Sequence, residues 1–296
     1  MDGRTDGRGQ RAPGEAFCER LSAAGTGTPL AASVGAAVTH LHRLIAETRP
    51  SPDDLRCALD FLTEVGLACD KRRQEWVLLS DVLGISTAVE DLARPRPAGA
   101  TPNTIAGPFY RADVPEMAPG ATISRDGRGE AVAVTGRVAD TAGRPVPGAM
   151  VEVWHADADG RYENQEPDRQ PEYNLRGRLR ADGEGRFRFF TIRPRGYALP
   201  GDGPVGRLFA ALGLPMDRPA HIHFRVTAPG FEVLTTHVFD KGDPAIGRDA
   251  IFGVKPALLG EFRAAPAGDG ACWALDVAFV LARAGETDGH HDHREG

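Results

Sequence analysis

Cysteine is scarce in this 296-residue chain: there are four, and none belongs to a Cys-x-x-Cys pair. So few cysteines exclude the disulfide scaffold of a small secreted protein, and they offer no thiolate cluster for a structural zinc site. We therefore expect a reducing compartment, the cytoplasm.

Long apolar runs and basic runs are missing too. No stretch approaches 18 consecutive apolar residues, so we expect no membrane span. The first 15 residues lack the apolar core of a secretory signal. A net charge of −6 without a basic patch argues against a nucleic-acid partner.

The first third of the chain has a helical period. Apolar side chains recur at three- and four-residue spacing, as in Leu30, Val34, Val38, Leu41 and Ile45. Ser51 as N-cap and Pro52 at the first helical position begin another helix. A Pro/Gly-rich linker from Pro95 ends the helical region.

After the linker the period changes to two. Short alternating stretches such as "AVAVTGRVAD", "AMVEVWHAD" and "HIHFRVTAPG" are separated by Gly, Pro and Asp turns. We predict an α+β protein whose second part is an antiparallel β-sandwich. The predicted domains are a disordered tail (1–14), a helical domain (15–94), a β-sandwich domain (95–283) and a disordered His-containing tail (284–296).

The stretch "RPAHIHFRV" is the first candidate site. His221 and His223 are two apart in a predicted strand, so their side chains share one face. Two of only four tyrosines, Tyr162 and Tyr197, lie within two residues of a glycine where strands give way to loops. Ordinary packing would also explain each feature taken alone.

Together these side chains favour a metal site. Zinc proteases would show His-Glu-x-x-His, which is absent, and non-haem Fe(II) oxygenases would pair two histidines with a carboxylate. A phenol becomes a ligand only when a strong cation holds it as phenolate. Two phenolates and one hydroxide neutralise three positive charges, which favours Fe(III) in a buried pocket.

Four stretches carry a resemblance to a known family: "NTIAGPFYRADVPE", "VTGRVADTAGRPVPGAMVEVWHADADGRYENQ", "YNLRGRLRADGEGRFRF" and "RPAHIHFRVTAPGFEVLTTHVFDKGDP". With "WVLLSDVLGIS" they span roughly residues 30 to 280, and the chain resembles the intradiol ring-cleavage dioxygenases. The resemblance implies a helical dimerisation domain that can hold a phospholipid, and a β-sandwich catalytic domain. It implies O2 as co-substrate, no NAD(P)H or flavin, and one Fe(III) per chain held by Tyr162, Tyr197, His221 and His223.

Within the family the chain looks more like the hydroxyquinol 1,2-dioxygenases. It reads "TTH", with His237, where catechol 1,2-dioxygenases usually read "TTQ", and Asp81 matches a pocket position of the hydroxyquinol branch. The implied reaction opens benzene-1,2,4-triol to 3-hydroxy-cis,cis-muconate (maleylacetate). Cleavage of catechol to cis,cis-muconate is the alternative.

The resemblance also implies roles for individual residues. Tyr197 is the labile ligand and general base, Arg218 stabilises charge developing on the ring, and His237 orients Arg218 or a ligand from behind. The residues expected to line the substrate slot, besides Asp81 and Arg218, are Leu78, Ile105, Gly107, Pro108, Phe109, Leu199, Pro200 and Ile251.

Two other classes of protein remain open from the sequence. Transthyretin-like binding modules share the sandwich pattern without catalysis, but they have no need of two loop tyrosines beside His-x-His. A zinc-dependent hydrolase would need a carboxylate placed as general base, and none is obvious.

Overall fold

The computed structural model describes residues 12–25, 27–71, 73–268 and 270–285. The chain divides into two compact units, Met1–Leu67 and Ala68–Gly296. The predicted tails lie largely outside the described residues. No helix in the described part of the chain is long and apolar enough to cross a membrane.

The first unit consists of α1 (Pro13–Ala23), α2 (Pro29–Thr48) and α3 (Pro52–Leu67). The structure confirms the predicted start of α3. There the Ser51 hydroxyl caps the helix by accepting a hydrogen bond from the Asp54 amide at 3.2 Å. The Asp54 carboxylate in turn accepts from the Ser51 amide at 2.8 Å, so two end amides are satisfied reciprocally. Several leucines along α2 and α3, among them Leu41 and Leu59, are more than half exposed.

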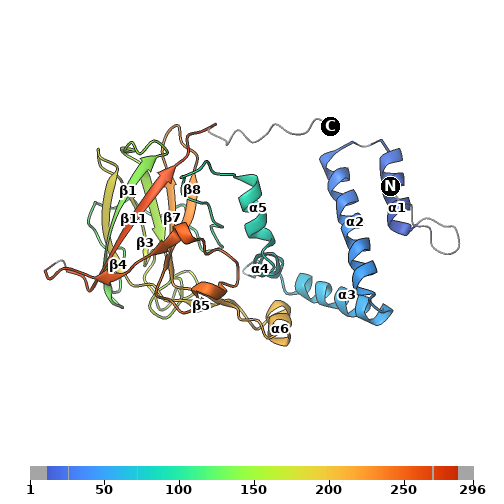
Figure 1. Ribbon diagram of the computed structural model, residues 1–296. Coiled ribbons are helices and arrows are strands. Elements are labelled where there is room, and N and C mark those ends of the chain that lie inside the picture. The colour runs from blue at the N-terminus through green and yellow to red at the C-terminus, as the bar shows by residue number, and fades with distance from the viewer. Residues whose placement is uncertain (1–11, 26, 72, 269, 286–296) are drawn as a thin grey trace. The chain divides into compact units, whose positions relative to one another are not determined.

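The second unit begins with α4 (Glu75–Val82) and α5 (Ile85–Ala93) and continues into two main sheets (Figure 1). One sheet has the order β10-β11-β1-β4. Its strands are β1 (Ala131–Asp140), β4 (Arg186–Ile192), β10 (Arg263–Ala264) and β11 (Trp273–Leu281). The other sheet has the order β3-β2-β7-β8-β9. Its strands are β2 (Met150–Trp154), β3 (Arg176–Arg180), β7 (His221–Thr227), β8 (Leu234–Asp240) and β9 (Leu259–Gly260).

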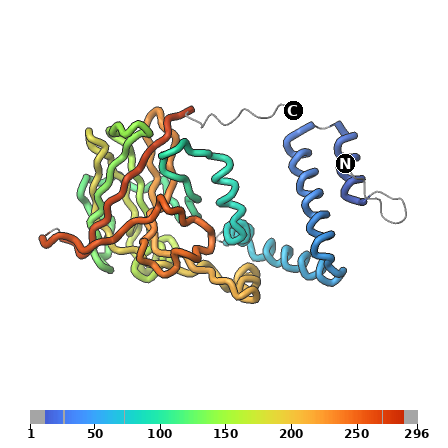
Figure 2. The backbone as a smooth tube through the Cα atoms, in the orientation of Figure 1, coloured from blue at the N-terminus to red at the C-terminus, as the bar shows by residue number. Residues whose placement is uncertain are grey.

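The remaining elements lie on connections. The chain leaves the sheets after β4, forms β5 (Tyr197–Ala198) and α6 (Pro204–Ala211), and returns through β6 (Asp217–Arg218), as the tube in Figure 2 shows. Strands β5 and β6 pair with each other, with Tyr197 opposite Arg218. Two short 3₁₀ helices, η1 (Ile246–Arg248) and η2 (Pro256–Leu258), follow β8.

The predicted α+β sandwich is confirmed, with one difference in strand direction. Strand β1 is parallel to β11, and β8 is parallel to β9, whereas an antiparallel sandwich was expected. Parallel neighbours require a crossover connection, and both pairs are joined by long segments of the chain. Alternation of apolar residues cannot reveal such a pairing, because it reports only which face of a strand is buried.

The core fills the space between the two sheets. From β7 it takes Ile222, Phe224 and Val226, all fully buried, and the Phe224 ring meets Phe189 of the opposite sheet edge-on. Gly136 leaves room for another core ring, since a Cβ there would lie 2.1 Å from the Phe187 ring. The alternate residues of β7 therefore point away from the core, to the outer face of the five-stranded sheet. That face carries the candidate site.

Candidate metal centre and substrate pocket

His221 and His223 lie side by side on the outer face of β7. Each is only 2% exposed, and their Nε2 atoms are 3.2 Å apart. The prediction that both side chains share one face is confirmed by this geometry. Two imidazole nitrogens brought so close inside the protein need either a shared proton or a cation between them.

The surroundings keep both imidazoles neutral. The Nδ1 atom of His221 lies 2.7 Å from the Pro219 carbonyl, which can only accept, so Nδ1 holds the proton and Nε2 presents a lone pair. Burial, reinforced by the Arg218 charge, lowers the pKa of His221 well below its usual range. Burial also lowers the pKa of His223, with His237 adding to the effect. Neutral imidazole is the form that binds metals.

Tyr162 reaches the same point from a turn. The Asp157 carboxylate accepts hydrogen bonds from the backbone amides of Asp159 and Arg161, both at 2.9 Å. These bonds stabilise the tight turn that directly precedes Tyr162. The Tyr162 hydroxyl lies 3.1 Å from His223 Nε2, and the side chain is 1% exposed. Burial raises the pKa of Tyr162 well above its usual value, so only a bound cation would convert it to phenolate.

Tyr197 completes the group of four. Its ring centroid lies 5.9 Å from that of Tyr162, edge-on, and 5.7 Å from the ring of His221. Gly196 permits this position, since a Cβ there would lie 2.7 Å from the Arg218 carbonyl oxygen. Unlike the other three side chains, Tyr197 is only half-buried. The structure thus gathers all four predicted ligands around one point.

The donor set fits a hard trivalent cation. Two neutral imidazoles and two phenols converge in a buried setting, and among the described residues the one clustered set of His, Cys, Asp or Glu ligands is His221, His223 and His237. His237 adds a third imidazole whose Nδ1 contacts the Thr104 hydroxyl, while its Nε2 has no partner in the described structure. Phenolates would supply the negative charge that the imidazoles lack.

Arg218 stands beside the four side chains. The guanidinium is buried, donates from Nε to Asp249 at 3.1 Å, and places Nη1 3.3 Å from His221 Nε2. Arg218 therefore forms a buried ion pair with Asp249 beside the four side chains, and its expected role at the reacting ring stays a prediction. Asp249, which sequence reasoning missed, fixes the direction of the guanidinium.

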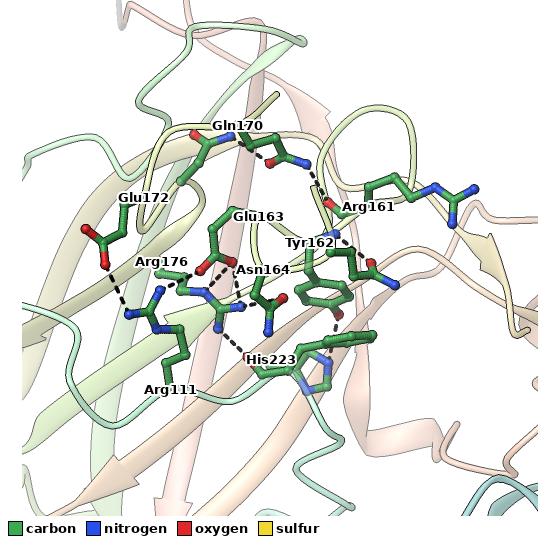
Figure 3. A network of polar contacts seen from close by, with 12 residues as sticks. Arg111, Arg161, Tyr162, Glu163, Asn164, Gln170, Glu172, Arg176 and His223 are labelled. Atoms are coloured by element: carbon green, nitrogen blue, oxygen red, sulfur yellow. Dashed lines mark hydrogen bonds and ion pairs between the residues drawn. The ribbon is translucent and has the colours of Figure 1, made fainter. Parts of the chain in front are cut away.

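A buried ion pair of Arg176 and Glu163 lies beside Tyr162 (Figure 3). Arg176 donates from Nε to Glu163 at 2.7 Å, and its other nitrogens reach Asn164 and the Phe109 carbonyl. The Phe109 ring stacks on Tyr162 with centroids 4.3 Å apart. Arg176 thus ties the loop bearing Tyr162 to the segment bearing Phe109. No local sequence pattern signals this link, because the partners come from three separate segments.

Trp154 is a second contact that sequence reasoning missed. Its ring stacks on His223 with centroids 4.7 Å apart and an angle of 11°. Trp154 lies opposite His223 in the β2–β7 register, which explains the stack. This contact of Trp154 with a candidate ligand follows from strand pairing, which the local sequence does not reveal.

The candidate slot residues come from five segments of the chain. Asp81 of α4 is partly buried with Oδ1 unpartnered, and burial raises its pKa against the opposing effects of Ser86 and the nearby Arg218 charge. Gly107, with φ of 70°, brings backbone close to the His223 ring. Ile105 and Ile251 line a small cavity together with His237. For all of these residues the role in binding substrate stays a prediction.

His155 is fully buried but separate in role from the cluster. Its ring nitrogens lie 2.7 Å from the Ala156 carbonyl and 2.6 Å from the Thr191 hydroxyl. Burial lowers the pKa of His155 to about 4, below the value of about 6.5 expected in the unfolded chain. The unfolded state therefore binds the proton first, and stability is lost as the pH falls from about 6.5 towards 4.

This difference in pKa between the folded and the unfolded chain predicts that burial of His155 makes the protein less stable in acid. Between pH 7.5 and 5.0 we expect the unfolding free energy of the metal-free protein to fall by about 2 kcal/mol less in His155→Gln than in the original chain. Urea unfolding at the two pH values measures this, and the comparison cancels the contributions of the other buried histidines. Equal pH dependence in both proteins would contradict the assignment.

Comparisons with known proteins agree with this fold. Residues 105–283 match the family model described as Dioxygenase, and residues 30–101 match the one described as Catechol dioxygenase N terminus. The chain is a ring-cleavage dioxygenase by class. It belongs to the intradiol ring-cleavage dioxygenase family, whose members use O2 and generally Fe(III). The alternative of a non-catalytic binding module is thereby set aside.

Individual relatives point in the same direction. A hydroxyquinol 1,2-dioxygenase of Rhizobium sp. (strain MTP-10005) is 46% identical over 252 residues, covering 82% of this chain and 85% of the relative. A catechol 1,2-dioxygenase of Candida albicans is 34% identical, with 84% of each chain covered. The crystal structure of a hydroxyquinol 1,2-dioxygenase from Pseudomonas putida DLL-E4 superimposes with a TM-score of 0.86 at 35% identity, covering 92% of this chain and 99% of that one.

Proposed function

We propose that this enzyme cleaves hydroxyquinol between its adjacent hydroxyl-bearing carbons and adds both atoms of O2, giving 3-hydroxy-cis,cis-muconate (maleylacetate). One Fe(III) per chain would be held by Tyr162, Tyr197, His221 and His223, without NAD(P)H or flavin. The convergence of these four side chains on the outer face of the five-stranded sheet carries the proposal. The 46% identity to a named hydroxyquinol 1,2-dioxygenase supports the substrate.

Bound Fe(III) would draw electron density from a chelated diolate and make its ring reactive towards O2. The protein must remove the protons of the two hydroxyls, and Tyr197 is the group suited to accept one. It is half-buried and carried on a short two-residue strand, whereas Tyr162 is buried under Phe109. Tyr162 would therefore stay in place while Tyr197 moves and takes up a proton.

Arg218 would stabilise negative charge as it develops on the ring. Its guanidinium is already held by Asp249 beside His221, so no reorganisation is needed during the reaction. His237, whose ring centroid lies 4.1 Å from that of His223, would keep that imidazole in position with the help of Thr104. These contacts support the predicted roles of both residues.

Asp81 would distinguish hydroxyquinol from catechol. Its unpartnered Oδ1 could accept a hydrogen bond from the third ring hydroxyl, which catechol lacks. We expect Asp81→Ala to lower kcat/KM for hydroxyquinol about 10- to 100-fold, the worth of one hydrogen bond to a charged group, and to change catechol turnover far less. Steady-state oxygen uptake with each substrate checks this. Equal losses on both would return Asp81 to an ordinary helix charge.

A direct experiment tests the reaction itself. The purified enzyme is supplied with hydroxyquinol under ¹⁸O2, and the product is identified by mass spectrometry. Two labelled oxygens in a ring-opened dicarboxylate are expected. A product with one label, or ring opening outside the two hydroxyl-bearing carbons, would contradict an intradiol dioxygenation of this substrate.

The proposal extends to assembly and location. The exposed leucines of α2 and α3 form apolar faces suited to a homodimer, which could also enclose a phospholipid. No disulfide joins the four cysteines in the described part of the chain, which supports a cytoplasmic location. Sedimentation equilibrium and mass spectrometry of extracted lipid test the assembly.

A further inference from the structure

A buried carboxylate at the start of α4 has no part in the mechanism above. Glu75 is 0% exposed, accepts from Arg73 Nε at 2.7 Å, and accepts from the backbone amide of Val205 at 3.1 Å. Val205 is the second residue of α6, which lies beside α4 in the fold (Figure 1). One side chain therefore joins two helices that are 130 positions apart in the sequence.

The partners of Glu75 explain why a carboxylate is stable there. The residue before α6 is Gly203, which has no side chain to cap the first amides of the helix. Glu75, which belongs to α4, provides that cap at the N-terminus of α6, where the helix dipole favours negative charge. Arg73 neutralises the carboxylate and also donates to Asp202 at 2.9 Å. We call these three residues, Arg73, Glu75 and Asp202, the α4–α6 clamp.

The clamp connects two walls of the proposed slot. Leu78 and Asp81 lie three and six residues after Glu75 on α4, so Leu78 is on nearly the same side of the helix as Glu75 and Asp81 is turned by about 120° from it. Asp202 and α6 follow Tyr197, Leu199 and Pro200 in the chain. Where this segment leaves the sheets, Tyr197 pairs with Arg218 and the Leu199 amide donates to the Met216 carbonyl. Further along the segment, Glu75 holds the start of α6.

Gly203 shows how closely the clamp is packed. A Cβ at this position would lie 2.1 Å from Arg73 Nη2 and 2.3 Å from Glu75 Oε1. The backbone of Gly203 has φ of −96°, which any residue can adopt, so glycine is required here for space alone. At Gly201, two residues earlier, a Cβ would have no neighbouring atom within 4 Å.

We propose that Arg73 and Glu75 are positioning residues that set the width of the diol slot, and so select substrates by the size of their ring substituents. They act through the separation of Leu78 and Asp81 from the segment that carries Leu199 and Pro200. This inference rests on the proposed function for the identity of the substrate, and it assigns the selectivity of that site to a clamp outside it.

The matched pair Gly203→Ala and Gly201→Ala tests the clamp. Gly203→Ala adds one methyl inside the clamp without backbone strain, whereas Gly201→Ala adds the same methyl in open space. We expect Gly203→Ala to raise KM for hydroxyquinol about tenfold with kcat nearly unchanged. The same variant should shift the preference between tert-butylcatechol and catechol, measured as the ratio of their kcat/KM values, about tenfold towards the bulkier substrate. Glu75→Gln should act in the same direction, and Gly201→Ala should behave as the original chain.

Hydrogen exchange in the metal-free protein gives a second readout. Gly203→Ala and Glu75→Gln should speed amide exchange across residues 199–211, while Gly201→Ala should not. If Gly203→Ala leaves both KM and the ratio between the substituted and plain catechols unchanged, the inference is overturned. A fall in kcat that only follows lost iron would likewise overturn it, since that marks a merely structural role.

Failure of the proposed function gives a different result. If the original chain cleaves no diol at all, the substrate assignment fails. The clamp is then still judged by exchange at residues 199–211 and by equilibrium binding of nitrocatechol and tert-butylcatechol. Unchanged exchange and binding in Gly203→Ala would refute the clamp on its own.

Discussion

Replacement of His223 by alanine is expected to abolish metal binding and turnover together. Mutating a residue that only supports a ligand typically lowers metal affinity by about 10- to 100-fold, and loss of a ligand itself should exceed this. We therefore expect His223→Ala, after purification without added iron, to retain less than about a tenth of the metal and to lose more than about 1,000-fold in turnover. Elemental analysis and oxygen uptake measure the two quantities.

His155 supplies the matched control for this substitution. It is a buried histidine of the same sheet region, yet both of its nitrogens are taken by Ala156 and Thr191. His155→Gln should therefore keep its iron. Equal metal loss in both variants would mean that general loosening of the fold, and not removal of a ligand, explains the result.

Arg218→Met is expected to show the second large effect, this time on kcat with iron retained. Loss of a preorganised charge at a reacting centre costs about 100- to 1,000-fold in kcat. The guanidinium already lies 3.3 Å from His221 Nε2, so its removal acts on the reacting centre directly. Stopped-flow measurement of ring cleavage, with iron content determined on the same samples, checks the prediction.

One side effect of this substitution must be separated from catalysis. Asp249 loses its buried partner in Arg218→Met, which can destabilise the protein by about 3–5 kcal/mol. The double variant Arg218→Met with Asp249→Asn removes the unpaired charge. If stability returns while kcat stays low, Arg218 acts in catalysis. Recovery of kcat with stability would reduce Arg218 to a structural ion pair.

The sequence was informative wherever the physical cause was local. Alternation along β7 places His221 and His223 on one face and Ile222 and Phe224 in the core, as the structure confirms. The start of α3 follows from Ser51 and Pro52 in the same way. In both cases the determining contacts lie within a few residues, so the pattern is visible in the chain.

Non-local contacts were beyond the sequence pattern. The parallel pairing of β1 with β11 joins strands more than a hundred residues apart. Asp249 accepts a hydrogen bond from Arg218, which lies 31 positions earlier in the chain. Glu75 caps a helix whose own first position carries no capping side chain. Only the fold brings these partners together, and their residue types are common enough on surfaces to pass unnoticed. The assignment of ligands depended instead on a family resemblance.

The most direct test of the proposed Fe(III) site is a visible absorption spectrum of the purified protein with iron analysis, followed by addition of hydroxyquinol without oxygen. Phenolate bound to Fe(III) absorbs visible light by charge transfer, so the account predicts a wine-red protein with one iron per chain. The band should shift when the substrate displaces Tyr197. A protein that stays colourless after ferric iron is supplied would contradict a site built from Tyr162, Tyr197, His221 and His223.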